Sequence, residues 1–276
     1  MSLDDRFFCD KFIDKTIKNV KGRTNQDRFI DIISDPNNLL IARCKNAGKI
    51  EENNVVLHNG IKVVKDGYYG DFSDILILNK GCHEPAEERM FTVILADIRE
   101  NGVMIELGSY WAFYSIWFNK AIKGAKNYCI EPSGKNLELG KTNCAINNVV
   151  ADFTLGFIGK GHINITEFVK EKNIDYIDIL HSDIQGYEVE MLEDITGLLD
   201  KQKIKYLFIS THNDRLHYNC IKILKEHNYR IIASADFGTE TFCSDGIIVA
   251  CHKDNLRFDE YHIGNRKHTQ LRTVPY

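Results

Sequence analysis

The sequence predicts an α/β fold built on a doubly wound, largely parallel sheet. From about residue 85 onward, apolar runs typical of strands alternate with segments whose apolar residues recur at helical spacing. The chain has 276 residues and 43% hydrophobic content, which is enough for a substantial core. It contains only four prolines and no low-complexity linker, so any domain boundary must be a compact junction.

Residues 1–84 differ from the rest and predict an N-terminal extension or cap. Between residues 5 and 35 the apolar positions predict two amphipathic helices, the second of which stops at Pro36. Short strands are then expected at residues 55–58, 61–64 and 74–78, with a hairpin turn at Asn59-Gly60.

Residues 85–252 carry the strand and helix alternation, and residues 253–276 form a basic C-terminal tail, expected to be a surface extension. Ser133 and Thr166 are expected to cap helices, and the last two strands are expected to pair as an antiparallel hairpin. The predicted helices are 86–99, 111–122, 134–146, 166–172 and 214–227. The predicted strands are 103–107, 127–131, 148–153, 176–182, 205–210, 229–235 and 246–251.

The composition limits the classes of partner. With 35 basic and 39 acidic residues the formal charge is -4, which offers no general attraction for nucleic acid or an anionic membrane. No apolar run approaches the roughly 20 residues that span a bilayer, and the amino terminus lacks a secretory pattern. We therefore expect a cytoplasmic protein that binds neither nucleic acid nor membrane.

The most informative stretch is MIELGSYWAFYSIWF at residues 104–118, followed by YCIEPS at residues 128–133. An apolar strand ends at Gly108, a helix follows, and a second apolar strand ends at Glu131. A glycine at a strand end lets the backbone approach a ligand, and an acid about 20 residues later accepts hydrogen bonds from ribose hydroxyls. This spacing predicts a site for a nucleotide-type cofactor.

The turn after the first strand favours S-adenosylmethionine over NAD. A dinucleotide site has three glycines in the pattern G-x-G-x-x-G, so that the pyrophosphate can rest on the turn. Here Gly108 is followed by Tyr110 and Phe113 at the other two places, which would crowd a pyrophosphate but leave room for a methionine tail. An NAD-linked oxidoreductase remains as an alternative.

Three strings together resemble the FkbM family of S-adenosylmethionine-dependent methyltransferases over about residues 80–252. They are MIELGSYWAFYS, YCIEPSGKNLELGKTNCAINN and IDILHSDIQGYEVEML. The third is similar to the family's D-x-E-G-x-E signature, with Asp183, Gly186 and Glu188 kept and Gln185 in place of the usual acid. The resemblance implies a Rossmann-like class I methyltransferase fold with a seven-stranded, mostly parallel sheet.

The resemblance also implies roles at the cofactor site. Glu106, Gly108 and Ser109 are expected to border the methionine end, Glu131 to hold the ribose and Asp152 to lie near the adenine. Tyr110 flanks the cofactor turn, and Ser133 follows the ribose carboxylate. The expected cofactor-binding residues are therefore Glu106, Gly108, Ser109, Tyr110, Glu131, Ser133 and Asp152.

Methyl transfer to an alcohol requires that the hydroxyl proton be removed. His181, Asp183 and His212 lie at predicted strand ends, where they could act as a base, so they are the candidate catalytic residues. Each also has a structural interpretation: His181 as a buried histidine bonded to backbone, Asp183 as the cap of the following turn and His212 as a loop residue. A Mg²⁺ site centred on Asp183 is an alternative, but no second carboxylate ligand is identified for it.

The segment GCHEPAEERMF at residues 81–91 places Glu84, Glu87 and Glu88 ahead of the first core strand. These acids are either a solvated helix start or groups that reach the cofactor or substrate. We expect an O-methyltransferase that acts on a hydroxyl of a small polar acceptor, a sugar or secondary metabolite. Because Gln185 replaces the usual acid, a non-catalytic cofactor-binding module is the alternative. The sequence also leaves open whether the protein forms a homo-oligomer.

Overall fold

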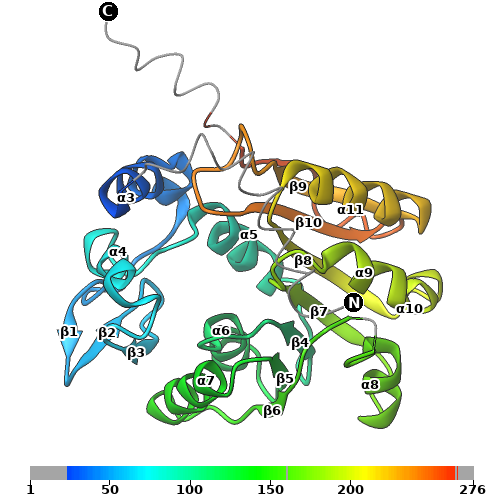
Figure 1. Ribbon diagram of the computed structural model, residues 1–276, viewed down its shortest axis with the longest axis horizontal. Coiled ribbons are helices and arrows are strands. Elements are labelled where there is room, and N and C mark those ends of the chain that lie inside the picture. Colours follow the sequence, from blue (N-terminus) through cyan, green and yellow to red (C-terminus); the bar gives the residue numbers. More distant parts are fainter. Residues whose placement is uncertain (1–23, 160, 265, 267–276) are drawn as a thin grey trace, which may run out of the picture.

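The computed structural model describes residues 24–159, 161–264 and 266. The helix expected within residues 5–20 and most of the basic tail lie outside the described residues. The described chain forms a large sheet covered on both faces by helices, with the extension on one side (Figure 1).

The large sheet has eight strands in the order β11-β9-β10-β8-β7-β4-β5-β6. The five strands from β8 to β6 are parallel, and β10 runs antiparallel between β8 and β9. The strands are β4 Val103–Leu107, β5 Lys126–Glu131, β6 Asp152–Leu155, β7 Ile177–Ser182, β8 Ile204–Thr211, β9 Tyr229–Ala235, β10 Gly246–His252 and β11 Tyr261–His262. This is the Rossmann-like class I methyltransferase fold that the sequence predicts. The eighth strand, β11, comes from the segment predicted to be a tail.

Helices cover both faces, which explains why central strands such as β7 are buried along their whole length. On one face lie α5 Pro85–Leu95, α6 Phe113–Ala121 and α7 Gly134–Ile146. On the other lie α8 Ile165–Glu171, α9 Glu188–Asp194, α10 Thr196–Asp200 and α11 Asp214–Glu226 (Figure 1). Each face has its own cluster of buried apolar side chains. Within the described residues, no helix has the length and apolar character needed to cross a bilayer.

The extension lies on the side of α5, α6 and α7 (Figure 1). It comprises α3 Asn25–Ser34, η2 Pro36–Leu40, β1 Ile50–Glu51, β2 Asn54–Val56, β3 Lys62–Val64, η3 Gly70–Ser73 and α4 Asp74–Leu78. Two amide side chains, one in α7 and one at its C-terminal cap, hold β3: Asn143 Oδ1 accepts from Val64 N at 3.0 Å, and Asn147 Oδ1 accepts from Lys62 N at 3.0 Å. The extension is therefore fixed to the helix that follows Glu131.

Several predicted elements are wrong in detail. Residues 74–78 form a helix, α4, not a strand, because the four-residue apolar run at 75–78 fits both the helical and the strand period and tertiary packing decides. The cap of α8 is Asn164, whose side chain accepts from Glu167 N, whereas Thr166 lies inside the helix. Strand β6 begins at Asp152, four residues later than predicted. Ser133 does cap α7, and β9 and β10 pair antiparallel as predicted.

Candidate active site

The carboxyl ends of four neighbouring parallel strands bring the predicted site residues to one edge of the sheet. Gly108 follows β4, Asp183 follows β7, Glu131 ends β5 and His212 follows β8. Two cavities open at this edge. We call the one of about 250 Å³ lined by Glu131 the ribose cavity, and the one of about 260 Å³ lined by Glu84 and Asp245 the acidic cavity. Both are lined by Tyr69, Gly108, Tyr110, Asp183 and Gln185.

Glu131 is held in one orientation at the end of β5. Its carboxylate accepts from Tyr110 N at 2.9 Å, from Ser133 N at 2.9 Å and from Asn136 Nδ2 at 3.2 Å, and the residue is only 4% exposed. A carboxylate has about four lone-pair sites, so it can still accept from a ligand. Apolar Phe157 and Ile158 line the same cavity. The combination of a fixed acid and apolar walls fits the ribose and base of a nucleoside.

The backbone just after β7 passes so close to Gly108 that no side chain fits there. The φ of Gly108 is +71°, and a Cβ at this position would lie 1.8 Å from the carbonyl oxygen of Asp183. The sequence predicts a glycine that lets a ligand approach, whereas the structure shows that the neighbouring backbone already requires it. The N–H groups of Gly108 and Ser109 both donate to the carbonyl of Ile130, which ties the turn to β5.

Asp152 is not brought to this edge. It begins β6 at the opposite end from the cavities, it is exposed, and its carboxylate pairs with Lys172 Nζ at 2.6 Å. The prediction that it lies near the adenine depended on a strand ending at residue 153. Because β6 continues to Leu155, Phe157 and Ile158 reach the ribose cavity instead.

His181 is buried in β7 and lines the acidic cavity. Its Nε2 lies 2.6 Å from Glu87 Oε1, and Glu87 Oε2 accepts from Ser210 Oγ at 3.3 Å. Burial lowers the pKa of His181 and raises the pKa of Glu87 well above its usual value. The Nδ1 atom of His181 has no hydrogen-bond partner among the described residues. His181 is therefore a neutral ring with a polar atom left unsatisfied.

His212 is surrounded by three carboxylates. Its Nδ1 lies 2.9 Å from Glu188 Oε1, and its Nε2 lies 3.2 Å from Asp183 Oδ1 and 3.4 Å from Asp245 Oδ1. Burial disfavours its charge, but these carboxylates outweigh burial and raise the pKa of His212 well above its usual value. An imidazolium cannot accept a proton, so this pKa direction argues against His212 as a base, and its catalytic role stays a prediction.

Asp183 stands where the two cavities meet. Burial would raise its pKa, but the hydrogen bond and charge of His212 lower it below the usual value. Gln185, which replaces the acid of the resemblance, donates from Nε2 to Asp183 Oδ1 at 3.1 Å. Asp183 is thus an ionised carboxylate with fixed orientation, and Gln185 supports it.

The sequence did not identify Asp245, and it left Glu84 and Glu87 undecided. Asp245 lies in the connection between β9 and β10, where no strand end or motif marks it. Burial raises the pKa of Asp245 to about 6, of Glu106 to about 7 and of Glu84 to about 8. Glu87 and Glu88, at the start of α5, are buried and face the protein interior, whereas Glu84 is partly exposed at the acidic cavity.

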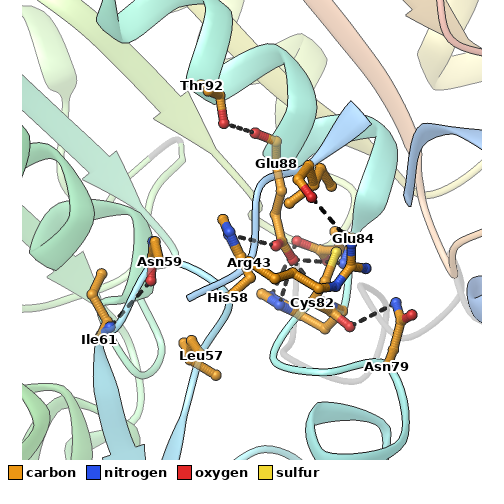
Figure 2. A network of polar contacts seen from close by, with 12 residues as sticks. Arg43, Leu57, His58, Asn59, Ile61, Asn79, Cys82, Glu84, Glu88 and Thr92 are labelled. Atoms are coloured by element: carbon orange, nitrogen blue, oxygen red, sulfur yellow. Dashed lines mark hydrogen bonds and ion pairs between the residues drawn. The ribbon is translucent and has the colours of Figure 1, made fainter. Parts of the chain in front are cut away.

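Glu88 holds the start of α5 to the extension. Figure 2 shows its carboxylate beside His58, whose Nε2 lies 2.9 Å from Oε2. Glu88 Oε1 lies 2.8 Å from His83 Nδ1 and also accepts from the backbone N–H groups of His83 and Glu84. Burial would raise the pKa of Glu88, but His83 and His58 lower it well below its usual value. This network positions Glu84 at the acidic cavity.

We expect the free energy of unfolding to fall as the pH rises from 6.5 to 8.5. A carboxyl group whose folded pKa is raised, such as Glu84 near 8, binds more protons folded than unfolded, so ionisation favours unfolding. His212, whose folded pKa is also raised, contributes in the same direction because its stabilising charge is lost at high pH. Urea unfolding at several pH values measures this slope. The variant Glu84→Gln should reduce it, and an unchanged slope would contradict the assignment.

The Mg²⁺ alternative gains no geometric support. In the part of the chain that the structure describes, no group of three or more His, Cys, Asp or Glu side chains is arranged to hold a metal ion. Metal dependence stays a prediction.

Comparisons with known proteins yield matches to solved structures only. No family model and no curated protein matches the sequence. A precorrin-6Y C5,15-methyltransferase from Geobacter metallireducens is 14% identical, with a TM-score of 0.45, and the match covers 60% of this chain and 88% of that one. TrmK of M. capricolum, solved with S-adenosylhomocysteine, is 18% identical over 63% of this chain and 69% of that one, with a TM-score of 0.42. A ribosomal protein L11 methylase from Lactobacillus delbrueckii is 10% identical over 60% and 78%, with a TM-score of 0.41.

Proposed function

We propose that the protein is an S-adenosylmethionine-dependent O-methyltransferase, related to the FkbM family, that acts on a hydroxyl of a small polar acceptor such as a sugar or secondary metabolite. The observation that carries the proposal is the fixed carboxylate of Glu131, which lies beside the Gly108 turn in a cavity that joins a second one. This arrangement has room for a nucleoside on one side and an acceptor on the other.

The residues present fit the cofactor. Glu131 would hold the ribose, Phe157 and Ile158 would flank the base, and Glu106 with the turn at Gly108 would border the methionine end. S-adenosylmethionine supplies a methyl group that is already activated, so the protein mainly aligns the acceptor.

Alignment of the acceptor falls to the residues where the cavities meet. Asp183 would accept a hydrogen bond from the acceptor hydroxyl, since its carboxylate is ionised and held by His212 and Gln185. His181 lines the same cavity with an unsatisfied ring nitrogen, which can hydrogen-bond the acceptor oxygen. His181 and Asp183 would thus fix the oxygen that receives the methyl group.

Transfer of a labelled methyl group from S-adenosylmethionine to a panel of hydroxylated acceptors, with and without Mg²⁺, tests the proposal. The variant Asp183→Asn is expected to bind S-adenosylhomocysteine within about threefold of the native protein but to lose about 100-fold or more in transfer rate, as removal of a general base does. Full activity in this variant would refute the role of Asp183. Methyl transfer by the native protein would dispose of the non-catalytic alternative.

A further inference from the structure

We propose that the acidic cavity binds a protonated amine of the acceptor, so that the methylated molecule is a small amino sugar or amino alcohol. The proposal rests on the proposed function and narrows its acceptor to cationic molecules. It is carried by an excess of carboxylates over cations at the cavity, by exposed carboxylate surface and by aromatic faces around it.

Carboxyl groups outnumber basic side chains in the described lining of the cavity. Four carboxyl groups line it, and Arg28 is the one Lys or Arg side chain among its described lining residues. Its guanidinium lies 4.2 Å from the ring centre of Phe72 and donates to Ser244 Oγ, and its charge lowers the pKa of Asp245 without forming an ion pair with any of the four. The lining acids are Glu84, Glu106, Asp183 and Asp245.

Neither Asp245 nor Glu84 has a cation of its own. Asp245 lies 3.4 Å from His212 Nε2, but that ring is closer to Asp183 and to Glu188, so one positive charge serves three carboxylates. About a fifth of the Asp245 side chain, 22%, remains exposed. Buried carboxylates without a matching cation are costly, and an ammonium group would relieve that cost.

Glu84 also shares its nearby histidine, His83, with another carboxylate. Its Oε2 accepts from the hydroxyl of Tyr114 at 3.0 Å and lies 3.5 Å from His83 Nε2, while the other nitrogen of His83 is 2.8 Å from Glu88. Its side chain is 21% exposed. Burial raises the pKa of Glu84, with repulsion from Glu87, Asp183 and Asp245, and burial raises the pKa of Asp245, with repulsion from Asp183 and Glu188. An ammonium group beside either carboxyl group would favour its ionised form and pair with it.

The walls of the cavity suit a cation as well. Tyr68, Tyr69 and Tyr114 line it, and Tyr69 is 59% exposed. Aromatic faces attract ammonium groups, and a carboxylate beside them adds a charge-assisted hydrogen bond. The unsatisfied Nδ1 of His181, a residue only 4% exposed, lies in the same lining and is a second sign that a polar ligand completes the site.

The cofactor does not account for Glu84 and Asp245. These acids come from the start of α5 and from the connection between β9 and β10, and neither lines the ribose cavity. Glu106, in β4 just before the Gly108 turn, is the acid expected at the methionine end, and Asp183 is proposed to hold the acceptor hydroxyl. Glu84 and Asp245 are left for the acceptor.

Matched probes test the proposal. We would titrate the full chain, saturated with S-adenosylhomocysteine, with primary amines and their N-acetyl counterparts, starting with glucosamine and N-acetylglucosamine and extending to amino alcohols, by saturation-transfer NMR. At least one amine is expected to bind about tenfold or more tightly than its neutral partner, since a hydrogen bond between charged groups contributes that much. The double variant Glu84→Gln with Asp245→Asn should abolish the preference, whereas Glu226→Gln, which removes an exposed charge on α11, should keep it.

The outcomes separate the two proposals. Equal binding of the amines and their N-acetyl partners, binding of neither, or a preference that survives the double variant would overturn the amine proposal. Calorimetry of the same samples with S-adenosylhomocysteine reports on the proposed function by itself and shows that each variant is folded. If the native protein did not bind S-adenosylhomocysteine, the proposed function would be overturned instead.

Discussion

Replacing Glu131 with alanine is expected to weaken the binding of S-adenosylhomocysteine by about tenfold to 100-fold. Three of the roughly four lone-pair sites of the carboxylate are used within the protein, so one hydrogen bond from a ribose hydroxyl to this charged group, worth about 1.5–3 kcal/mol, would be lost. The change would also release the N–H groups of Tyr110 and Ser133, which Glu131 holds at 2.9 Å, so the cofactor turn would loosen. Isothermal titration calorimetry measures the change directly.

Glu131→Gln is the matched variant. It keeps the size of the side chain, but one oxygen becomes an NH₂ group that faces a backbone donor. We therefore expect a loss of affinity between that of the native protein and that of Glu131→Ala. An affinity within about threefold of native for both variants would show that the carboxylate does not hold the ribose, since that difference is below 1 kcal/mol.

Replacing Glu88 with alanine is expected to lower the free energy of unfolding by about 3–5 kcal/mol, the usual cost of breaking a buried ion pair by removing one partner. Glu88 is fully buried, and its loss would leave His58 and His83 without their carboxylate and two backbone N–H groups without an acceptor. Urea unfolding of the native protein and of the variant, monitored by circular dichroism, gives the difference in free energy of unfolding.

Glu100→Ala is the control for this variant. Glu100 is 66% exposed and pairs with Lys123 on the surface, so its removal should cost less than about 1 kcal/mol. If Glu88→Ala were no more destabilising than Glu100→Ala, the network in Figure 2 would not hold α5 to the extension. Glu88→Ala protein that stays folded should also show a weaker amine preference, because the backbone N–H of Glu84 would lose Glu88 Oε1, the acceptor that holds it at the cavity.

The sheet and the position of Glu131 at the end of β5 were predictable because their signals are local. An apolar run that ends in Gly108 or Glu131 marks both the strand and its end, and the prediction of β4 is confirmed residue for residue. Residues 74–78 were not predictable, since the four consecutive apolar residues 75–78 fit a strand and a buried helix equally well.

The residues of the acidic cavity were harder to predict from the sequence, because they come together only through tertiary structure. Asp245 meets Asp183 and His212 across strands that are distant in the chain, and nothing within a few residues of it indicates that contact. His212 was expected to act as a base because its type and strand-end position fit one. Its three carboxylate neighbours, which set its charge, appear only in the fold.

The most direct test of the account is titration calorimetry of the purified protein with S-adenosylhomocysteine, with NAD as the control and after confirming that no ligand copurifies. The account predicts micromolar binding of S-adenosylhomocysteine and none of NAD, since the cofactor turn keeps only Gly108 of the three dinucleotide glycines. Binding of NAD alone, or of neither molecule, would contradict the assignment of Glu131 and the Gly108 turn as a methyltransferase cofactor site.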